Sequence, residues 1–416
     1  MTSLVRISAS ISATFAITLL FSFMAITNQP AQGQTFTVIH NFSGGSDGWA
    51  PFAGVTLDQA GNLYGTTVAG GLPDQSVGAV YKIALVRSNW ITTPLYNFAA
   101  QPDGSLPTAR VVFGPDGALY GTTSGGGSQN SGTVFRMTPP SHPCQRVFCP
   151  WTETILYNFQ DGSDGGRPYL GDLVFDAEGN IYGTTLGSDT CRIACGNVFK
   201  LTRSGGTWTE SVLYAFTDGS NPQSGVIFDH AGNLYGTTKD GGANFTGSVY
   251  ELSPSGSGWT KQNIYSFSFD GAQDGQRPYG GLAFDNQGSL YGTASIKGPQ
   301  GGGTVFKLTP SAGGWTFALL HGFSGTFGPV ATLTLDANGN VYGTSEQTGG
   351  GGLVFELTFS NGGWTYTDLH DFSGPDGYEP VGGVTLDAHG NRYGTTYYGG
   401  SGDCYRGCGV VWEITP

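Results

Sequence analysis

The sequence predicts an all-β protein built from seven copies of one unit, and two observations support that prediction. The motif Tyr-Gly-Thr-Thr, or a near copy, occurs seven times at spacings of 51 to 62 residues, which leaves room for about four short strands per unit. The composition agrees, because 71 Gly, 26 Phe and 20 Tyr with only 11% charged residues are typical of a turn-rich β protein. The motifs begin at Tyr64, Tyr120, Tyr182, Tyr235, Tyr291, Tyr342 and Tyr393.

The third unit shows the strand pattern that the others repeat. Its apolar runs cover residues 167–176, 181–185, 196–202 and 208–216. Each run is short and bounded by Gly, Asp, Asn or Ser, and none has an apolar stripe with helical spacing. We therefore expect four antiparallel strands in every unit.

A turn of the form Asp-x-x-Gly joins the first two strands. The Asp can accept backbone N–H groups of its own turn, and the Gly takes the positive φ of a tight hairpin. Calcium binding is the alternative for so many Asp residues, but near-identical copies favour a turn device. The Asp residues are Asp58, Asp176, Asp229, Asp285, Asp336 and Asp387, and the second unit has Asp116 in a Gly-Pro-Asp-Gly variant.

The two chain ends predict a closed ring. The chain stops directly after the third strand of the seventh unit, while residues 37–42 form an additional fourth strand ahead of the first unit. Pairing that strand with the last unit removes the open sheet edges of the array. We expect a seven-bladed β-propeller of four-stranded antiparallel blades, closed by the N-terminal strand completing the last blade. An open solenoid is the alternative, but it needs capping repeats that the sequence lacks.

The first 33 residues differ from the repeats. Arg6 precedes a largely apolar stretch and a short polar tail, which is typical of a secretory signal peptide. A retained membrane anchor is the alternative. We expect residues 34–416 to form a single propeller domain that is secreted or held in the periplasm or cell envelope, with no membrane span in the mature chain.

The cysteines fit an exported chain. All six fall in local pairs, which favours disulfides that staple loops, and a zinc site is the weaker alternative because the spacing of zinc ligands is missing. The pairs are Cys144 with Cys149, Cys191 with Cys195, and Cys404 with Cys408.

Charge limits the partners. Without Arg6 the chain has 16 basic and 30 acidic side chains, a net charge of −14. A nucleic-acid partner is therefore not expected, because it requires clustered basic charge. We expect a monomer that binds an extracellular or envelope ligand, with no cofactor and no metal.

A repeat can reveal a site where its own pattern breaks. One position of the first strand reads Gly54, Arg110, Asp172, Gly225, Gly281, Thr332 and Gly383. Arg110 and Asp172 fall in adjacent blades and can meet, either in a polar pocket at the channel mouth or as an ion pair between blades. Arg110, Asp172 and Thr332 are the candidate binding residues. Variable loops between the second and third strands share their face with a repeated Asp-Gly-x-x-Pro segment, and such loops commonly build binding sites.

Catalytic residues are not evident. His40, His321 and His370 occupy the position that Tyr fills in other units, which indicates shared packing. No Ser-His-Asp spacing, nucleophile elbow or His-Glu-x-x-His motif is present.

The unit Asp-x-x-Gly-Asn-Leu-Tyr-Gly-Thr-Thr, followed by Gly-Thr-Val-Phe-Lys-Leu-Thr-Pro and Gly-Gly-Trp-Thr, resembles the GloVer tandem repeat. The resemblance covers about residues 36–416 and implies an exported bacterial repeat protein with no assigned activity and no catalytic residues to transfer. Some relatives look to have a C-terminal anchoring segment. This chain ends at Pro416 without one, so we expect release rather than anchoring.

Three functional hypotheses follow. The first is a non-catalytic module that binds a carbohydrate, peptide or envelope partner through the face with the variable loops. The second is a lactonase-like or glycan-cleaving propeller enzyme, which needs converging carboxylates or a metal in the channel. The third is a purely structural envelope protein, which would show no saturable ligand.

Overall fold

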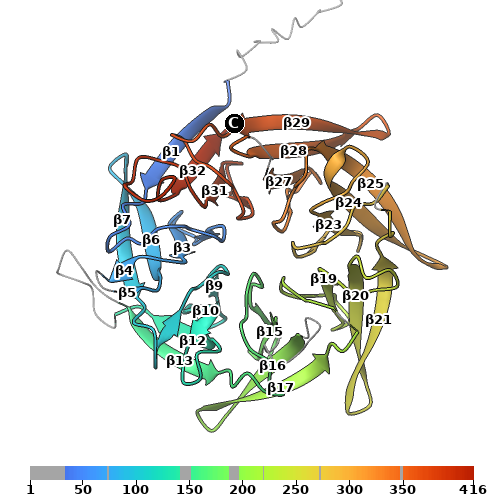
Figure 1. Ribbon diagram of the computed structural model, residues 1–416, viewed down its shortest axis with the longest axis horizontal. Helices are drawn as coiled ribbons and strands as arrows, with labels where there is room; N and C mark the ends of the chain where they lie inside the picture. The colour runs from blue at the N-terminus through green and yellow to red at the C-terminus, as the bar shows by residue number, and fades with distance from the viewer. Residues whose placement is uncertain are drawn as a thin grey trace, which may run out of the picture. The chain divides into compact units, whose positions relative to one another are not determined.

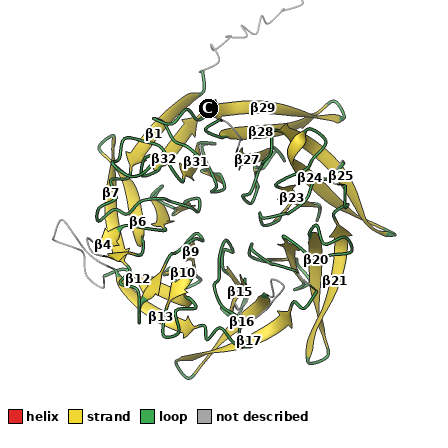
Figure 2. Cartoon of the chain, in the orientation of Figure 1, coloured by secondary structure: helices red, strands yellow, loops and turns green. Residues whose placement is uncertain are grey.

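The computed structural model describes residues 33–72, 75–140, 151–186, 196–218, 220–270, 273–346 and 350–416. Residues 1–32 of the predicted signal peptide and Cys144, Cys149, Cys191 and Cys195 lie outside these residues. Seven four-stranded antiparallel sheets are arranged as the blades of a ring (Figure 1), and the described segments are strands and loops throughout (Figure 2). The predicted seven-bladed β-propeller is thus confirmed. Across the described ranges, no helix is long and apolar enough to span a membrane.

The blades repeat one strand order from the axis outward. The first strands are β2 (Thr56–Leu57), β9 (Val112–Phe113), β14 (Val174–Phe175), β18 (Ile227–Phe228), β22 (Ala283–Phe284), β26 (Thr334–Leu335) and β30 (Thr385–Leu386). The second strands carry the Tyr-Gly-Thr-Thr motif and are β3 (Leu63–Thr67), β10 (Leu119–Thr123), β15 (Ile181–Thr185), β19 (Leu234–Thr238), β23 (Leu290–Ala294), β27 (Val341–Ser345) and β31 (Arg392–Thr396).

In most units the third and fourth strands form a long hairpin, which is the outer half of the blade. The third strands are β6 (Ala79–Val86), β12 (Thr133–Thr138), β16 (Asn197–Ser204), β20 (Ser248–Ser255), β24 (Gly301–Ser311), β28 (Leu353–Ser360) and β32 (Val410–Thr415). The fourth strands are β7 (Asn89–Asn97), β13 (Thr152–Asn158), β17 (Thr207–Ala215), β21 (Gly258–Ser266), β25 (Gly314–Ser324), β29 (Gly363–Asp371) and β1 (Thr35–Asn41). Short loop strands are β4 (Gly71–Leu72), β5 (Gln75–Ser76), β8 (Gly104–Ser105) and β11 (Gly125–Gly126).

The N-terminal strand closes the ring as predicted. β1 pairs antiparallel with β32 from Thr35 opposite Thr415 to Asn41 opposite Val410, so the last sheet has the order β1-β32-β31-β30 (Figure 1). Side chains reinforce this pairing, because the Phe36 ring stacks on His370 at 3.5 Å and Phe42 is fully buried. The chain ends are therefore held by both a ladder and a core.

The first three positions of the Tyr-Gly-Thr-Thr motif each have a structural role. The Tyr hydroxyl donates to the Asp of the preceding turn in all seven blades. The Gly leaves room for the third-strand aromatic ring; a Cβ at Gly121, for example, would lie 2.6 Å from Phe135 Cζ. The first Thr donates to a carbonyl of the next blade's inner segment in six blades, including Thr395 to Ala53 across the closure at 2.9 Å. The motif thus joins turn, sheet and neighbouring blade.

The Asp-x-x-Gly turns act as the predicted turn devices. Asp58 Oδ1 accepts the N–H groups of Ala60 and Asn62, and its Oδ2 accepts Asn62 Nδ2 and the Tyr64 hydroxyl. Burial acts to raise the pKa of Asp58, but these hydrogen bonds outweigh it and the pKa lies below its ordinary value. Within the described part of the chain, no three Asp, Glu, His or Cys side chains come together as a metal site.

The first strands are shorter than predicted. The sequence indicates a strand over residues 167–176, but only Val174–Phe175 pairs with β15. The preceding residues lie against neighbouring blades instead: a Cβ at Gly225 would lie 2.5 Å from the Asp172 carbonyl oxygen, and one at Gly54 would lie 2.4 Å from that of Gly383. Backbones converge on the axis here, which leaves no space for a longer ladder.

The hydrophobic core is divided among the junctions between blades. Seven clusters of buried side chains each draw on two adjacent blades. In the cluster between the third and fourth blades, Tyr182 and Phe216 pack against Tyr250 and Leu252. Stability therefore depends on contacts around the whole ring.

The Tyr250→Phe substitution should stabilise the protein. Tyr250 is fully buried, its hydroxyl has no partner among the described residues, and four other blades have Phe at this position. An unpaired buried hydroxyl costs about 1–3 kcal/mol, so its removal should raise the free energy of unfolding by about 1 kcal/mol. Tyr235→Phe is the matched control, since the Tyr235 hydroxyl donates to Asp229, and it should lower stability. A lower melting temperature for Tyr250→Phe would contradict this interpretation.

Candidate functional site

One face of the ring is built from two sets of loops that brace each other. The segments leading into the first strands pair with the loops between second and third strands, as in the bridges of Trp49 with Ala69 and of Tyr378 with Tyr398. We call this the loop face.

The Asp of the Asp-Gly-x-x-Pro segment holds these loops by hydrogen bonds with side chains of the fourth strands. It accepts a hydrogen bond from the fourth-strand Tyr in three blades, for instance Tyr96 to Asp103 at 2.9 Å. His40 lies 3.2 Å from Asp47, and His370 lies 2.8 Å from Asp376. The predicted shared position of His and Tyr is therefore confirmed at His40 and His370. His321 has no Asp in its loop and instead stacks on Tyr366 at 3.9 Å.

The Pro of the same segment directs the chain toward the axis. In each blade it packs on the Gly that opens the third strand of the preceding blade, as Pro51 does on Gly409 and Pro278 on Gly247. The residue after the Pro lines the axial cavity in five blades: Phe52, Thr108, Tyr279, Val330 and Val381. Tyr169 and Gln223 occupy this position in the third and fourth blades.

Aromatic side chains gather where these segments meet. The Phe52 ring lies 5.9 Å from that of Tyr169 and 5.3 Å from that of Tyr397, which directly follows the motif of the seventh unit. Phe52 and Tyr279 also line the axial cavity, and all four side chains are half-buried. The rings of Phe52, Tyr169 and Tyr397 present a contiguous aromatic surface at the centre of the loop face.

Two carboxyl groups flank the rings. Glu346 follows the motif of the sixth unit, and Glu379 precedes Pro380. Burial raises the pKa of Glu346 to about 7, and the charge of Glu379 adds to the rise. Burial raises the pKa of Tyr169, with Tyr279 and Glu346 as further causes. We call Phe52, Tyr169, Tyr279, Tyr397, Glu346 and Glu379 the axial mouth.

Arg110, Asp172 and Thr332 lie deeper along the axis. All three line a cavity of about 80 Å³ to which every blade contributes. Asp172 Oδ2 accepts Arg110 Nε at 2.8 Å and Nη2 at 2.5 Å, and Asp172 Oδ1 accepts the Arg110 backbone N–H at 3.1 Å. Thr332 Oγ1 accepts the N–H of Gly281. The structure thus brings Arg110 and Asp172 together and places Thr332 elsewhere on the cavity wall.

The Arg110–Asp172 pair joins the second and third blades. The charge of Asp172 raises the pKa of Arg110, and their side chains are 30% and 26% exposed. At this same junction the motif hydroxyl of Thr122 has no partner among the described residues. The ion pair therefore supplies a link between blades where the repeated hydrogen bond is missing.

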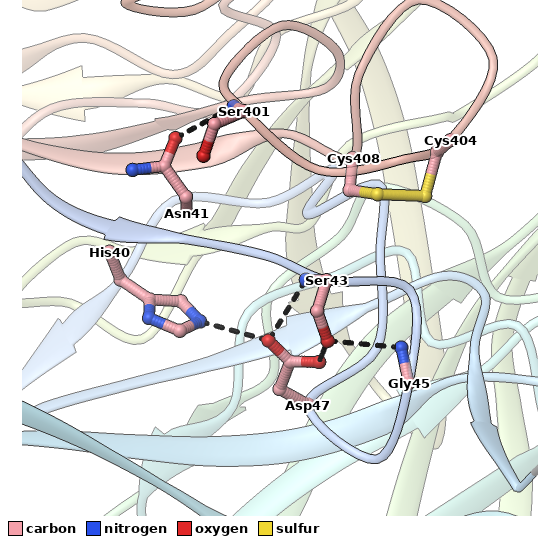
Figure 3. The surroundings of a disulfide bond; sticks show 8 residues. All are labelled: His40, Asn41, Ser43, Gly45, Asp47, Ser401, Cys404 and Cys408. Atoms are coloured by element: carbon pink, nitrogen blue, oxygen red, sulfur yellow. Dashed lines mark hydrogen bonds and ion pairs between the residues drawn. A yellow bond between two sulfur atoms is a disulfide. The ribbon is translucent and has the colours of Figure 1, made fainter.

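A disulfide fixes one loop beside the site. The predicted Cys404–Cys408 bond is present, and it lies next to the loop from Ser43 to Asp47 (Figure 3). The two loops are in close contact, since a Cβ at Gly44 would lie 2.9 Å from Cys404 Sγ. Asn41 Oδ1 accepts the N–H of Ser401 at 3.0 Å (Figure 3), so the N-terminal strand also holds this loop.

The comparison of the repeats singled out Arg110, Asp172 and Thr332, which line the axial cavity, but not the residues of the axial mouth. The alignment that singles out Arg110 and Asp172 also shows Phe52, Tyr169 and Tyr279 breaking the pattern after Pro. The sequence alone does not show that the position after Pro faces the axis, so these aromatic residues could not be recognised as part of a site.

The blades and the loop face define a β-propeller repeat protein. Residues 24–150 and 147–352 match the Gloeobacter/Verrucomicrobia repeat. The chain belongs to this repeat family, in agreement with the resemblance of its motifs. None of the curated protein sequences matches the chain.

Solved structures share the fold at low identity. Polysaccharide lyase Uly1 is 10% identical, with a TM-score of 0.51 over 88% of this chain and 89% of that chain. A Bacteroides uniformis protein provisionally described as a 6-phosphogluconolactonase is 16% identical, with a TM-score of 0.47 over 77% of this chain and 84% of that chain. A puromycin hydrolase is 14% identical, with a TM-score of 0.49 over 83% of this chain and 50% of that chain. At these identities the similarity concerns the fold alone.

Proposed function

We propose that this chain is an exported, non-catalytic binding protein whose ligand is a carbohydrate and whose ligand site is the axial mouth. The observation that supports this most strongly is the contiguous aromatic surface of Phe52, Tyr169 and Tyr397 at the centre of the loop face. Partly exposed rings offer apolar faces on which sugar rings stack. Glu346 and Glu379 offer oxygen atoms to sugar hydroxyls.

Export and the role of the deeper residues belong to the same proposal. The Cys404–Cys408 disulfide fits an oxidising compartment outside the cytoplasm. Arg110, Asp172 and Thr332 form the floor beneath the mouth, where they would contact a group that reaches into the axial cavity.

Removing one mouth aromatic should weaken glycan binding. A neutral-glycan and peptide array would first identify a bound sugar, and calorimetric titration would then compare variants. Phe52→Ala and Tyr397→Ala should each weaken binding by about tenfold, because each loses an aromatic contact of about 1 kcal/mol or more. Phe359→Ala is the control, since Phe359 is 58% exposed but packs against Trp364 away from the mouth.

Three outcomes would overturn the proposal. Saturable binding to peptides only would identify a different ligand class, and an array without saturable binding would favour a structural role. An equal loss in Phe359→Ala would place the site elsewhere.

A glycan-cleaving enzyme is the second candidate, and Glu346 favours it. A carboxyl whose pKa is about 7, close to a second carboxyl, can act as an acid or a base near neutral pH. This candidate predicts release of new chain ends from a bound oligosaccharide. Glu346→Gln should abolish that release while saturable binding persists, because Gln keeps an oxygen atom for the sugar hydroxyls. A bound oligosaccharide that stays uncleaved on prolonged incubation would exclude this candidate.

A further inference from the structure

The aromatic surface of the mouth continues outward along the seventh blade. The Tyr397 ring, which packs on Phe52, lies 4.4 Å from the ring of Tyr398. Tyr398 lies opposite Tyr378, and the two exchange backbone hydrogen bonds of 2.9 Å each. Aromatic side chains therefore follow one another from the axis into the loops of this blade.

The disulfide loop lies at the outer end of this row. The Arg406 guanidinium lies 5.6 Å from the ring of Tyr378 and 5.9 Å from the ring of Tyr405. Arg406 Nη1 is also 3.5 Å from Glu379 Oε1. Arg406 thus connects Glu379 of the axial mouth to the rings of Tyr378 and Tyr405, and Tyr405 lies in the disulfide loop.

The disulfide loop exposes the Tyr405 side chain to solvent. Tyr405 is 78% exposed, although it sits between two cysteines joined to each other. Backbone hydrogen bonds fix the loop further, from Gly399 to the Arg406 carbonyl at 2.8 Å and from Ala50 to the Cys408 carbonyl at 2.8 Å. Arg406 has a φ of 63°, a conformation that costs free energy in a residue other than Gly. An exposed aromatic side chain on a fixed backbone binds a ligand with a smaller loss of conformational entropy than one on a mobile loop.

We propose that these side chains form a binding track, from Phe52 through Tyr397, Tyr398 and Tyr378 to Tyr405, that takes an extended neutral polysaccharide chain. The proposal rests on the proposed carbohydrate-binding function. Rings spaced along a blade suit successive sugars of a chain better than a single sugar in a pocket. The only cation of the track, Arg406, already faces Glu379, so it is not free to pair with an anionic chain.

The length of the oligosaccharide is the variable that tests the track. Calorimetric titration with cello-, xylo- and manno-oligosaccharides should give, for the series that binds, a higher affinity for the hexasaccharide than for the disaccharide. Tyr405→Ala should weaken the hexasaccharide about tenfold and leave the disaccharide unchanged, whereas Phe52→Ala should weaken both. Phe245→Ala is the matched control, because Phe245 is 74% exposed in a loop of the fourth blade.

The outcomes distinguish failure of the track proposal from failure of the axial-mouth proposal. Equal affinity for short and long chains, with both lost in Phe52→Ala, would overturn the track and leave the mouth in place. A hexasaccharide loss in Phe245→Ala equal to that in Tyr405→Ala would also overturn the track. Absence of binding across all three series would overturn both proposals. The Cys404→Ser/Cys408→Ser variant should reproduce the Tyr405→Ala pattern while keeping a cooperative melt.

Discussion

Removing residues 34–42 will abolish the folded ring and give aggregated protein. The deletion takes away β1, whose pairing with β32 runs from Thr35 to Asn41. It also removes Phe42, which is fully buried, and Phe36, which packs against Phe372 and Trp412. Each lost core side chain costs about 1.5–3 kcal/mol, and the total approaches the 5–15 kcal/mol that stabilises a typical domain.

The exposed edge explains why aggregation should follow. Without β1, the strand Val410–Thr415 has unpaired N–H and C=O groups and carries Val411 and Trp412. Apolar edge strands of this kind pair with other chains. Size-exclusion chromatography with light scattering would show the aggregate, and the matched control, a chain lacking only residues 1–33, should remain folded. A truncated protein that stays monomeric and melts like this control would contradict the closure.

Raising the pH from about 5 to about 8 should destabilise the ring through two glutamates. Glu153 on β13 lies near Asp103 in the segment that connects the first and second blades, and Glu210 on β17 lies near Asp164 in the segment that connects the second and third blades. Burial, with the neighbouring carboxylate as the second cause, raises the pKa of each Glu to about 7. One carboxyl oxygen of each Glu is buried with no partner among the described residues. Both groups therefore favour the protonated state in the folded protein.

The sign of the effect follows from proton binding. Because the folded protein holds these protons more tightly than the unfolded chain, their stabilisation is complete below the ordinary pKa of 4.5 and is lost as the pH rises through about 7. Allowing for partial exposure, each group should contribute about 2 kcal/mol to that loss. Urea unfolding at both pH values would measure it. The Glu153→Gln/Glu210→Gln variant should lose most of the pH dependence, and an unchanged profile would show that these carboxyls are not its source.

The fourth blade supplies a natural comparison for Glu210. Lys261 occupies the equivalent position there, lies 3.0 Å from Asp218 and is 6% exposed. Glu210→Lys should therefore replace a repulsive pair with an ion pair and raise stability at about pH 8 by about 2 kcal/mol. Thr209→Lys introduces a positive charge on an exposed neighbouring residue, which changes the net charge by +1 where Glu210→Lys changes it by +2, and it should have little effect. A stability gain in Thr209→Lys of half that in Glu210→Lys or more would mean that net charge, rather than the junction, governs stability.

The parts of the fold that depend on repetition could be predicted from the sequence. Each Tyr-Gly-Thr-Thr motif marks a second strand, and the extra strand at residues 37–42 indicates the closure, because both signals are local and recur at a regular spacing. The length of the first strands could not be predicted, since it depends on how closely backbones such as those of Gly54 and Gly383 approach at the axis. The axial mouth was missed because residues such as Phe52 and Tyr397 are far apart in the sequence and meet only in the closed ring.

Hydrogen–deuterium exchange with and without a bound neutral hexasaccharide tests the proposed function most directly. If the axial mouth binds the glycan, protection should rise in the segments around Phe52, Tyr169 and Tyr397 and in the disulfide loop, and the Asp-x-x-Gly turns on the other side should not change. Protection confined to those turns, or spread evenly over the ring, would contradict a ligand site on the loop face.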